Sequence, residues 1–354
     1  MTDAPNEQRE LIALRKLSVR LARNPLLVQA STGNISIKIG DSLWIKASGK
    51  WLAQAEADDF LVTVGLARAK RCVRDGLAIP ETEATSAGAP GASIETAMHA
   101  VLPHRVVIHV HSVNTITWAI REDGPRQLGT RLGGLPWRWI PYTPSGNALA
   151  KEIDNVLSCF PQTHVLILAN HGLVVCGDCC RTAALLLSDV ERRLAIEPRS
   201  ASKFDFAQLA RKLPNSRWFV PRSTAIHALA RDHISRRILA GGVLYPCQAI
   251  FLAETVPMAA SPLAQEVAAG RWAHGGKRTF LVLEHQGVLC NKHIAPAEQE
   301  LLFGLANIVQ RIDASATLRY LSDSEVEEVL HGQLQHYRRV ATPDCRERTE
   351  RVAI

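Results

Sequence analysis

Hydrophobic residues in the first part of the chain follow two periods, one typical of helices and the other of strands. From Glu7 to Leu21 apolar residues recur among charged ones, which predicts an amphipathic opening helix. Segments 34–38 and 42–46 both alternate apolar with polar residues, and Gly40-Asp41 lies between them, so we expect a hairpin. A further strand is expected over 60–64.

Strands and helices then alternate as far as residue 195. Short apolar runs predict buried strands, and longer runs with helical spacing predict helices. The predicted strands are 106–110, 139–142, 165–169 and 173–176, and the predicted helices are 93–102, 113–120, 148–157 and 181–195. The segment 84–91, rich in Ala, Gly and Pro, is expected to be a surface loop.

The second part of the chain follows a charged stretch from Glu197 to Arg222 that has Pro198 and Pro214 as helix breakers. Beyond it the pattern predicts strands over 249–253 and 279–283 and amphipathic helices over 296–312 and 323–337. We therefore expect a domain over residues 1–197, a linker or helical connection over 198–240, and a smaller α+β unit over 241–354.

Composition changes this picture little. The chain has 354 residues, 47% of them hydrophobic and 21% charged, as in soluble globular proteins. No apolar run approaches the length of a membrane helix, and the polar N-terminus lacks a secretory signal, so a cytoplasmic protein without a membrane segment is expected.

The net charge of +7 is compatible with a nucleic-acid partner or with an anionic substrate. The basic residues are dispersed, and the group from Arg68 to Arg74 contains no aromatic residue. This pattern favours solvated helix faces over a nucleic-acid surface and leaves a small anionic substrate open.

Eight cysteines are scattered, mostly in apolar surroundings, which favours reduced thiols over disulfides. Cys176, Cys179 and Cys180 form a C-x-x-C cluster that is compatible with a metal or redox site. No second pair of ligands stands at zinc-ribbon spacing, so structural thiols are the favoured interpretation.

Three histidines stand at the ends of predicted buried strands. His109 and His111 are two residues apart, a spacing that points both side chains of a strand to the same face, and His171 follows the strand 165–169. Three imidazoles with an open fourth position are typical of a catalytic metal site. Zinc suits neutral imidazoles best, and Mn²⁺, Co²⁺, Ni²⁺ or Fe²⁺ would also fit.

Glu95 is the only carboxylate between Gly91 and Asn114. Beside a metal it could serve as a general acid or base, and in the first turn of a helix it could instead stabilise the helix dipole. Two small turns, Ser31 to Asn34 and Ala47 to Gly49, have exposed backbone N–H groups suited to an anionic or hydroxylated group.

Five ordered motifs resemble the class II aldolase/adducin family over about residues 7–195. They are Gly33-Asn34-Ile35-Ser36, Ala47-Ser48-Gly49, Ser93-Ile94-Glu95, His109-Val110-His111 and Asn170-His171-Gly172. The resemblance implies a three-layer α/β/α sandwich around a central mixed, largely antiparallel sheet. It also implies a homo-oligomer, a ring-like tetramer with sites between subunits.

The resemblance assigns roles to residues of the five motifs. His109, His111 and His171 would be the zinc ligands, and Glu95 would be the acid/base close to the metal. The residues that would contact substrate are Ser31, Asn34, Ser48, Gly49 and Ser93. In this family a tyrosine, often from a neighbouring subunit, completes the site, and Tyr142 is the nearest candidate.

The implied reaction is cleavage of a C–C bond in a sugar, sugar phosphate or sugar acid through a metal-stabilised enediolate. An epimerase or dehydratase acting on a ketose phosphate would use the same site, and a non-catalytic adducin-like protein is the third alternative. Ile94 and the turn Ser31-Thr32-Gly33 depart from the phosphate-binding pattern, so phosphate recognition stays open. Similar longer proteins usually have Asp-His where this chain has Cys247-Gln248.

Overall fold

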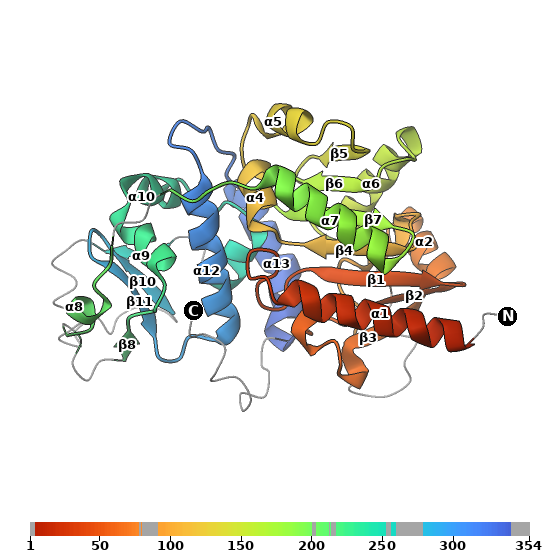
Figure 1. The fold of residues 1–354 in the computed structure, drawn as a ribbon, viewed down its shortest axis with the longest axis horizontal. Coiled ribbons are helices and arrows are strands. Elements are labelled where there is room, and N and C mark those ends of the chain that lie inside the picture. The colour runs from red at the N-terminus through yellow and green to blue at the C-terminus, as the bar shows by residue number, and fades with distance from the viewer. Residues whose placement is uncertain are drawn as a thin grey trace. The chain divides into compact units, whose positions relative to one another are not determined.

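The chain divides into two compact units, residues 1–195 and residues 196–354 (Figure 1). The structure is a computed structural model that describes residues 4–77, 79, 91–199, 203–211, 213, 217–252, 256–259 and 279–340, with the backbone alone at Ala4, at Asp58 and at 332–340. Each unit has its own sheet and its own core.

The first unit is built on a seven-stranded sheet in the order β3-β2-β1-β4-β7-β6-β5. The strands are β1 (Asn34–Ile39), β2 (Ser42–Lys46), β3 (Leu61–Gly65), β4 (Val106–Val110), β5 (Trp137–Ile140), β6 (Val165–Leu168) and β7 (Gly172–Gly177). All neighbouring strands are antiparallel except β5 and β6, which are parallel. The sheet is therefore mixed and largely antiparallel, as the sequence predicted.

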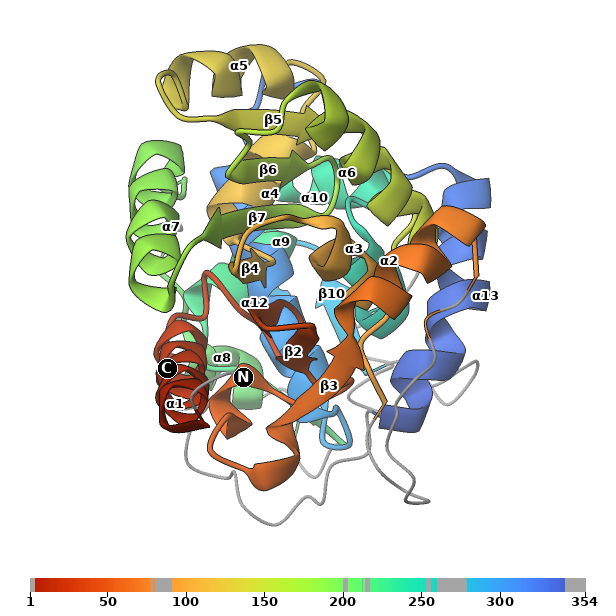
Figure 2. The same cartoon turned by 90° about the vertical axis from the view of Figure 1, so that its right-hand side faces the viewer.

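Helices cover both faces of this sheet (Figure 2). One face carries α1 (Ala4–Ala22), α4 (Val113–Ala119), α5 (Gly124–Arg131) and α7 (Cys180–Leu194), and the other carries α2 (Leu66–Asp75), α3 (Thr96–Val101) and α6 (Asn147–Cys159). Two short 3₁₀ turns, Leu52–Gln54 and Asp58–Phe60, precede β3. The three-layer α/β/α sandwich is confirmed.

Strand β4 lies in the middle of the sheet, and every one of its residues is buried. Val107 packs in a cluster with Met98 and Leu102 of the α3 segment. Because side chains alternate across a strand, His109 lies on the same face as Val107, toward α3. The apolar run of β4 thus fixes the direction in which its histidine points.

The sequence predicted most elements of the first unit within a few residues. Helix α3 begins at Thr96 and not at Ser93, because the residues from Ser93 to Glu95 form a turn in which the Ser93 carbonyl accepts from the Thr96 N–H. Helix α5 was missed, since its Gly-Pro start and polar composition give no clear helical period. Of the predicted loop 84–91, only Gly91 lies within the described residues.

The second unit has a four-stranded sheet in the order β8-β11-β10-β9. Its strands are β8 (Trp218–Phe219), β9 (Met258–Ala259), β10 (Phe280–Leu283) and β11 (Gly287–Asn291). Its helices are α8 (Phe206–Arg211), α9 (Thr224–Arg231), α10 (His233–Ala240), α12 (Pro296–Arg311) and α13 (Asp323–Val340). The expected smaller α+β unit is present, and α12 and α13 match the two predicted helices.

Two features of the second unit differ from the sequence pattern. The strand predicted over 249–253 is wrong, because Gln248–Leu252 is a single turn of π-helix. The Gln248 side chain accepts from the Leu244 N–H and donates to the Gly242 carbonyl, which ties the first residue of the turn to the segment before it. A short apolar run does not by itself distinguish helix from strand. Residues 198–240 contribute α9 and α10 to the core of this unit.

Candidate metal centre

The candidate metal ligands gather at one end of the first unit's sheet. His109 lies near the end of β4 and pairs with Asn34, the first residue of β1, on one side and with Val174 of β7 on the other. His111 follows β4 directly, and His171 lies in the turn between β6 and β7. Residues far apart in the sequence therefore meet because β4 and β7 are antiparallel neighbours.

The side chains of Glu95, His109, His111 and His171 form one cluster. One ligand atom from each lies within 4.8 Å of the others, and all four residues are buried. The Nε2 atoms of His109 and His111 are 3.0 Å apart, and the Nε2 atoms of His109 and His171 both lie 3.2 Å from Oε1 of Glu95. A tetrahedral zinc with ligands about 2.1 Å away holds those atoms about 3.4 Å apart. The spacing fits a small divalent cation.

The hydrogen bond of His109 sets which ring nitrogen faces the cluster. Its Nδ1 lies 3.0 Å from the Leu173 carbonyl oxygen, which can only accept, so Nδ1 carries the hydrogen. The neutral ring then presents the Nε2 lone pair to the other ligands. A backbone carbonyl that orients an imidazole in this way is a common partner of metal-binding histidines.

Glu95 stands at the N-cap of α3, where the turn from Ser93 aims its carboxylate at the histidines. Asn34 Nδ2 donates to Oε2 of Glu95 and, over 3.0 Å, to Oγ of Ser93. The N–H of Glu95 donates to the same Ser93 oxygen over 3.3 Å. Of the residues expected to contact substrate, Asn34 and Ser93 thus lie against Glu95, and Asn34 binds Oε2 while His109 and His171 lie at Oε1.

Burial and charge tune the ionisable groups of the cluster. Burial by itself raises the pKa of Glu95, but the neighbouring His109 and His171 outweigh it and hold this pKa well below its usual range. Burial lowers the pKa of His111 and of His171. At neutral pH the cluster therefore offers a carboxylate at Glu95 and neutral imidazoles at His111 and His171, which is the protonation that binding a divalent metal requires.

The two predicted turns flank this cluster. Gly33 and Gly49 both have left-handed backbones, with φ of +72° and +71°. Ser31 and Ser48 are both half-buried, and the Ser48 N–H donates to the carbonyl of Gly91, in the segment that leads to Glu95. Ser31, Ser48 and Gly49 lie on turns near the cluster, and their contact with substrate remains a prediction.

Tyr142 is half-buried and follows β5. Ile140 pairs with Leu168, so Tyr142 lies at the same end of the sheet as His171, two strands away from β7. A Cβ atom on Gly146 in the same loop would lie 3.8 Å from Ile94, next to Glu95. The catalytic role of Tyr142 stays a prediction.

Two residues near the site were missed by the sequence analysis. Lys46, the last residue of β2, is only 2% exposed. Asn170, which precedes His171, has a left-handed backbone with φ of 52° and is buried. The available signals were a lysine directly before an Ala-Ser-Gly turn and an asparagine, which tolerates positive φ better than most residues.

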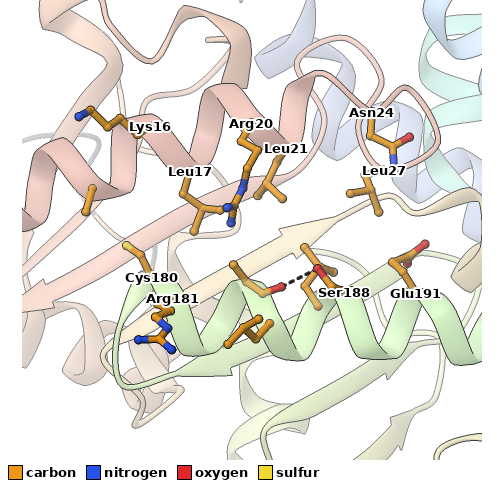
Figure 3. Close-up of a pocket in the computed structure, with 14 residues that line it drawn as sticks. Lys16, Leu17, Arg20, Leu21, Asn24, Leu27, Cys180, Arg181, Ser188 and Glu191 are labelled. Atoms are coloured by element: carbon orange, nitrogen blue, oxygen red, sulfur yellow. Dashed lines mark hydrogen bonds between the residues drawn. The ribbon is translucent and has the colours of Figure 1, made fainter.

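A groove of about 910 Å³ lies elsewhere on the first unit, between α1 and α7 (Figure 3). Leucines such as Leu17 and Leu21 line it, and Lys16, Arg20 and Arg181 add positive charge. It includes none of the four clustered residues. Cys176, Cys179 and Cys180 are free thiols near the start of α7, and burial raises the pKa of Cys176 to about 12.

Within the described part of the chain, no helix is long and apolar enough to cross a membrane.

Known proteins resemble parts of this chain. A curated relative, an uncharacterised oxidoreductase YuxG of Bacillus subtilis (strain 168), is 32% identical over 93 residues, which are 26% of this chain and 13% of that protein. The chain thus matches only a small part of that relative's length.

Two solved structures are similar to about half of the chain. The N-terminal class II aldolase domain of a conserved protein from Thermoplasma acidophilum is 24% identical, with a TM-score of 0.44, and the match covers 51% of this chain and 90% of that one. The L-fuculose-1-phosphate aldolase of Thermus thermophilus is 18% identical, with a TM-score of 0.37, and the match covers 52% of this chain and 92% of that one.

The family model of the class II aldolase and adducin N-terminal domain matches residues 14–197, more than half of the chain and the whole of the site described above. The matched range contains all four clustered residues, Glu95, His109, His111 and His171, and ends near the boundary between the two units. The chain belongs to the class II aldolase and adducin family.

Proposed function

We propose that this protein is a divalent-metal-dependent aldolase that breaks or forms a C–C bond of a sugar, sugar phosphate or sugar acid. The observation that supports this most is the placement of Glu95 Oε1 at 3.2 Å from two of the three clustered histidine Nε2 atoms. A carboxylate beside a metal site can exchange a proton with a substrate carbon.

His109, His111 and His171 would hold the metal, with zinc as the proposed ion. When bound, the metal would polarise a substrate carbonyl and stabilise the negative charge that develops as the C–C bond breaks. Its ligands come from rigid β4 and from the tight β6–β7 turn, so they need little rearrangement.

The chain's own residues would manage the proton transfers. In the cleavage direction the C3–C4 bond breaks, the C4 hydroxyl loses its proton to become an aldehyde, and the electron pair left on C3 accepts a proton. We assign the proton at C3 to Glu95, whose carboxylate Asn34 orients through Oε2. Tyr142, from this chain or from a neighbouring copy in a proposed tetramer, is the candidate for the C4 hydroxyl proton.

Metal content is the first test. Purified protein is expected to contain about one divalent metal per chain, and His109→Ala to lose it, because the Nε2 of that ring would be one of the three imidazole ligands. His164→Ala is the matched control, since His164 is half-buried and lies outside the cluster. Metal-free wild-type protein, or equal metal content in the His109→Ala variant, would refute the proposal.

The second test is turnover. Ketose 1-phosphates and ketose acids are screened for cleavage, and their aldehyde halves are screened for condensation with dihydroxyacetone phosphate or pyruvate. Glu95→Gln is expected to keep the metal and to lose about 10²- to 10⁴-fold in kcat, the usual contribution of a general acid or base. Full activity of this variant would remove Glu95 from the mechanism.

The same screen separates the alternatives. An epimerase would convert a ketose phosphate without cleaving it, and a dehydratase would release water, both with the metal and Glu95 in place. An adducin-like interaction protein would show none of these activities and would not need the three histidines that this chain has.

A further inference from the structure

The strands of the two units follow one plan. In the first unit β4, β7, β6 and β5 are neighbours in that order, and only the β6–β5 pair is parallel. In the second unit β8, β11, β10 and β9 are neighbours in that order, and only the β10–β9 pair is parallel. Along the chain, α4 and α5 follow β4 as α9 and α10 follow β8, and α7 follows β7 as α12 follows β11 (Figure 1). The second unit therefore repeats the order and the direction of these elements.

The turns between the paired strands match residue by residue. The Asn170 N–H donates to the Ala119 carbonyl of α4 over 3.0 Å, and the His285 N–H donates to the Ala230 carbonyl of α9 over 2.9 Å. Asn170 and His285 also both have left-handed backbones, with φ of 52° and 64°. Each bond ties the turn to the helix that follows the neighbouring edge of the sheet, so Asn170 and His285 are equivalent positions.

The residue before each of these positions matches as well. The Ala169 N–H donates to the Ile140 carbonyl of β5 over 2.9 Å, and the Glu284 N–H donates to the Ala259 carbonyl of β9 over 3.0 Å. Consecutive residues of one turn thus correspond to consecutive residues of the other. The two turns can therefore be superimposed in register, without insertion or deletion.

The same positions form the core on one face of each sheet. The cluster of the first unit includes five residues from four strands, Val107, Ile140, Leu166, Leu168 and Val174. Counting from the turns along the paired strands, the equivalent residues are, in the same order, Trp218, Ala259, Leu281, Leu283 and Leu289. All five belong to one buried cluster of the second unit. The repeat therefore extends from topology to packing.

The register also identifies the residues that stand where the first unit has its candidate metal ligands. The equivalents of His109, His111 and His171 are, in that order, Val220, Arg222 and Gln286. An apolar side chain and a neutral amide do not replace imidazoles as ligands, and a guanidinium group repels a cation. Among the described residues, the group of His and Glu side chains that could hold a metal lies in the first unit.

We propose that the second unit is an internal repeat of the β4–α7 half of the metal domain, and that the end of β8 and the β10–β11 turn form a latent metal site that has lost its ligands. The second unit is then a metal-free copy, and the metal chemistry belongs to the first unit alone. This inference goes beyond the proposed function and does not depend on which reaction the first unit catalyses.

The test restores the three histidines in the full chain. The variant Val220→His/Arg222→His/Gln286→His is expected to bind one more divalent metal per chain than the wild type, because three imidazoles would converge as they do in the first unit. Zinc content and the visible absorbance of bound Co²⁺ measure the gain. The gain is counted relative to the wild type, so it is independent of whether the first unit binds metal, and the two proposals can fail separately.

The matched control is Val220→His/Arg222→His, which lacks the histidine in the β10–β11 turn. It should bind the added metal more weakly than the triple variant by at least about tenfold, since even groups that only support a ligand are worth roughly 10- to 100-fold in metal affinity. Two results would overturn the inference. One is a folded triple variant with the metal content of the wild type, and the other is equal affinity of the double and triple variants for the added metal.

Val220 packs against the buried cluster, so circular dichroism checks that the triple variant folds. If it does not fold, Arg222→His/Gln286→His takes its place, because Arg222 is exposed and Gln286 is half-buried. Cu²⁺ is the divalent ion that imidazoles bind most tightly, so this pair is expected to bind one Cu²⁺ more per chain than the wild type. The wild-type Cu²⁺ content in this variant would show that the turn does not meet the end of β8, and the inference would be wrong.

Discussion

The role of His109 depends on the different partners of its two ring nitrogens. Nδ1 contacts the Leu173 carbonyl, and Nε2 faces His111 and Glu95. The Leu173 residue pairs with Val110 in the β4–β7 ladder, so the strand register places this carbonyl beside the ring. One residue's tautomer is thus set by backbone geometry, with no side chain required.

Gly33 is a second residue whose identity follows from a close contact. A Cβ atom there would lie 2.8 Å from the carbonyl oxygen of His109, and the backbone has φ of +72°. An alanine would both strain the turn and push on β4, which carries His109 and leads directly to His111.

We therefore expect Gly33→Ala to weaken metal binding on the order of tenfold, as displaced supporting groups do in other metal sites. It should also lower the free energy of unfolding by more than the roughly 1–2 kcal/mol of a left-handed alanine. Equilibrium metal titration and urea unfolding measure the two effects.

Gly134→Ala is the control for this substitution. Gly134 also has a positive φ, of +82°, but a Cβ atom there would meet nothing within 4 Å. It should show the conformational cost alone and keep full metal affinity. If both variants lost metal equally, the contact with His109 would not be the cause.

At the scale of elements, the alternation of side chains across β4 does most to build the site. The even-numbered residues of β4 face α1 and α7, while Val107 and His109 face α3, whose N-cap is Glu95. A shift of one residue in the β1–β4 register would turn His109 away from Glu95.

In the second unit, one buried histidine joins α9 to β11. His227 is 1% exposed, its Nε2 donates to the Pro221 carbonyl over 2.7 Å, and its Nδ1 accepts from the Val288 N–H over 3.0 Å. This arrangement requires the neutral ring. Burial lowers the pKa of His227 to about 4, which the bond to Pro221 opposes only in part.

The pKa of His227 is lower in the folded protein than in the unfolded chain, where it is about 6.5. Protonation of this histidine therefore destabilises the unit as pH falls. Its contribution to stability is complete above about pH 6.5 and is lost progressively down to about pH 4. From pH 7 to pH 5 we expect His227 to remove about 2 kcal/mol from the free energy of unfolding. Hydrogen exchange of the β10 and β11 amides at both pH values measures this loss.

His227→Gln should reduce that pH dependence, whereas His233→Gln should not, because His233 has an 80% exposed side chain. If the free energy of unfolding depended on pH equally in the His227→Gln variant and in the wild type, other groups would be responsible.

At the scale of the whole molecule, the chain divides after Ala195 into two compact units. All four clustered residues and the turns with Lys46 belong to residues 1–195, which have hydrophobic clusters of their own. The four clustered side chains therefore all come from the first unit.

We expect a fragment of residues 1–195 to fold and to bind about one metal per chain, as full-length protein does. Circular dichroism and metal analysis test this, with residues 196–354 as the fragment expected to bind none. An aggregated or metal-free fragment 1–195, under conditions in which the full chain is loaded, would show that the second unit is required.

The sequence alone determined the strands of the first unit, the hairpins between them and the three histidines, because periodicity and residue type are local properties. It could not distinguish a strand from the helical turn observed at Gln248–Leu252, because a short apolar run fits both. It also placed the start of α3 three residues early, where Ser93 holds a turn.

Only the tertiary structure decided which residues meet. Glu95 had two interpretations from the sequence, as a helix-capping residue or as an acid/base, and its contacts with His109 and His171 favour the second. The bonds of the Lys46 ammonium group to the Ser31 and Lys50 carbonyls were not predicted either. Such contacts depend on distances between segments far apart in the chain, which strand order and register fix and which no local pattern contains.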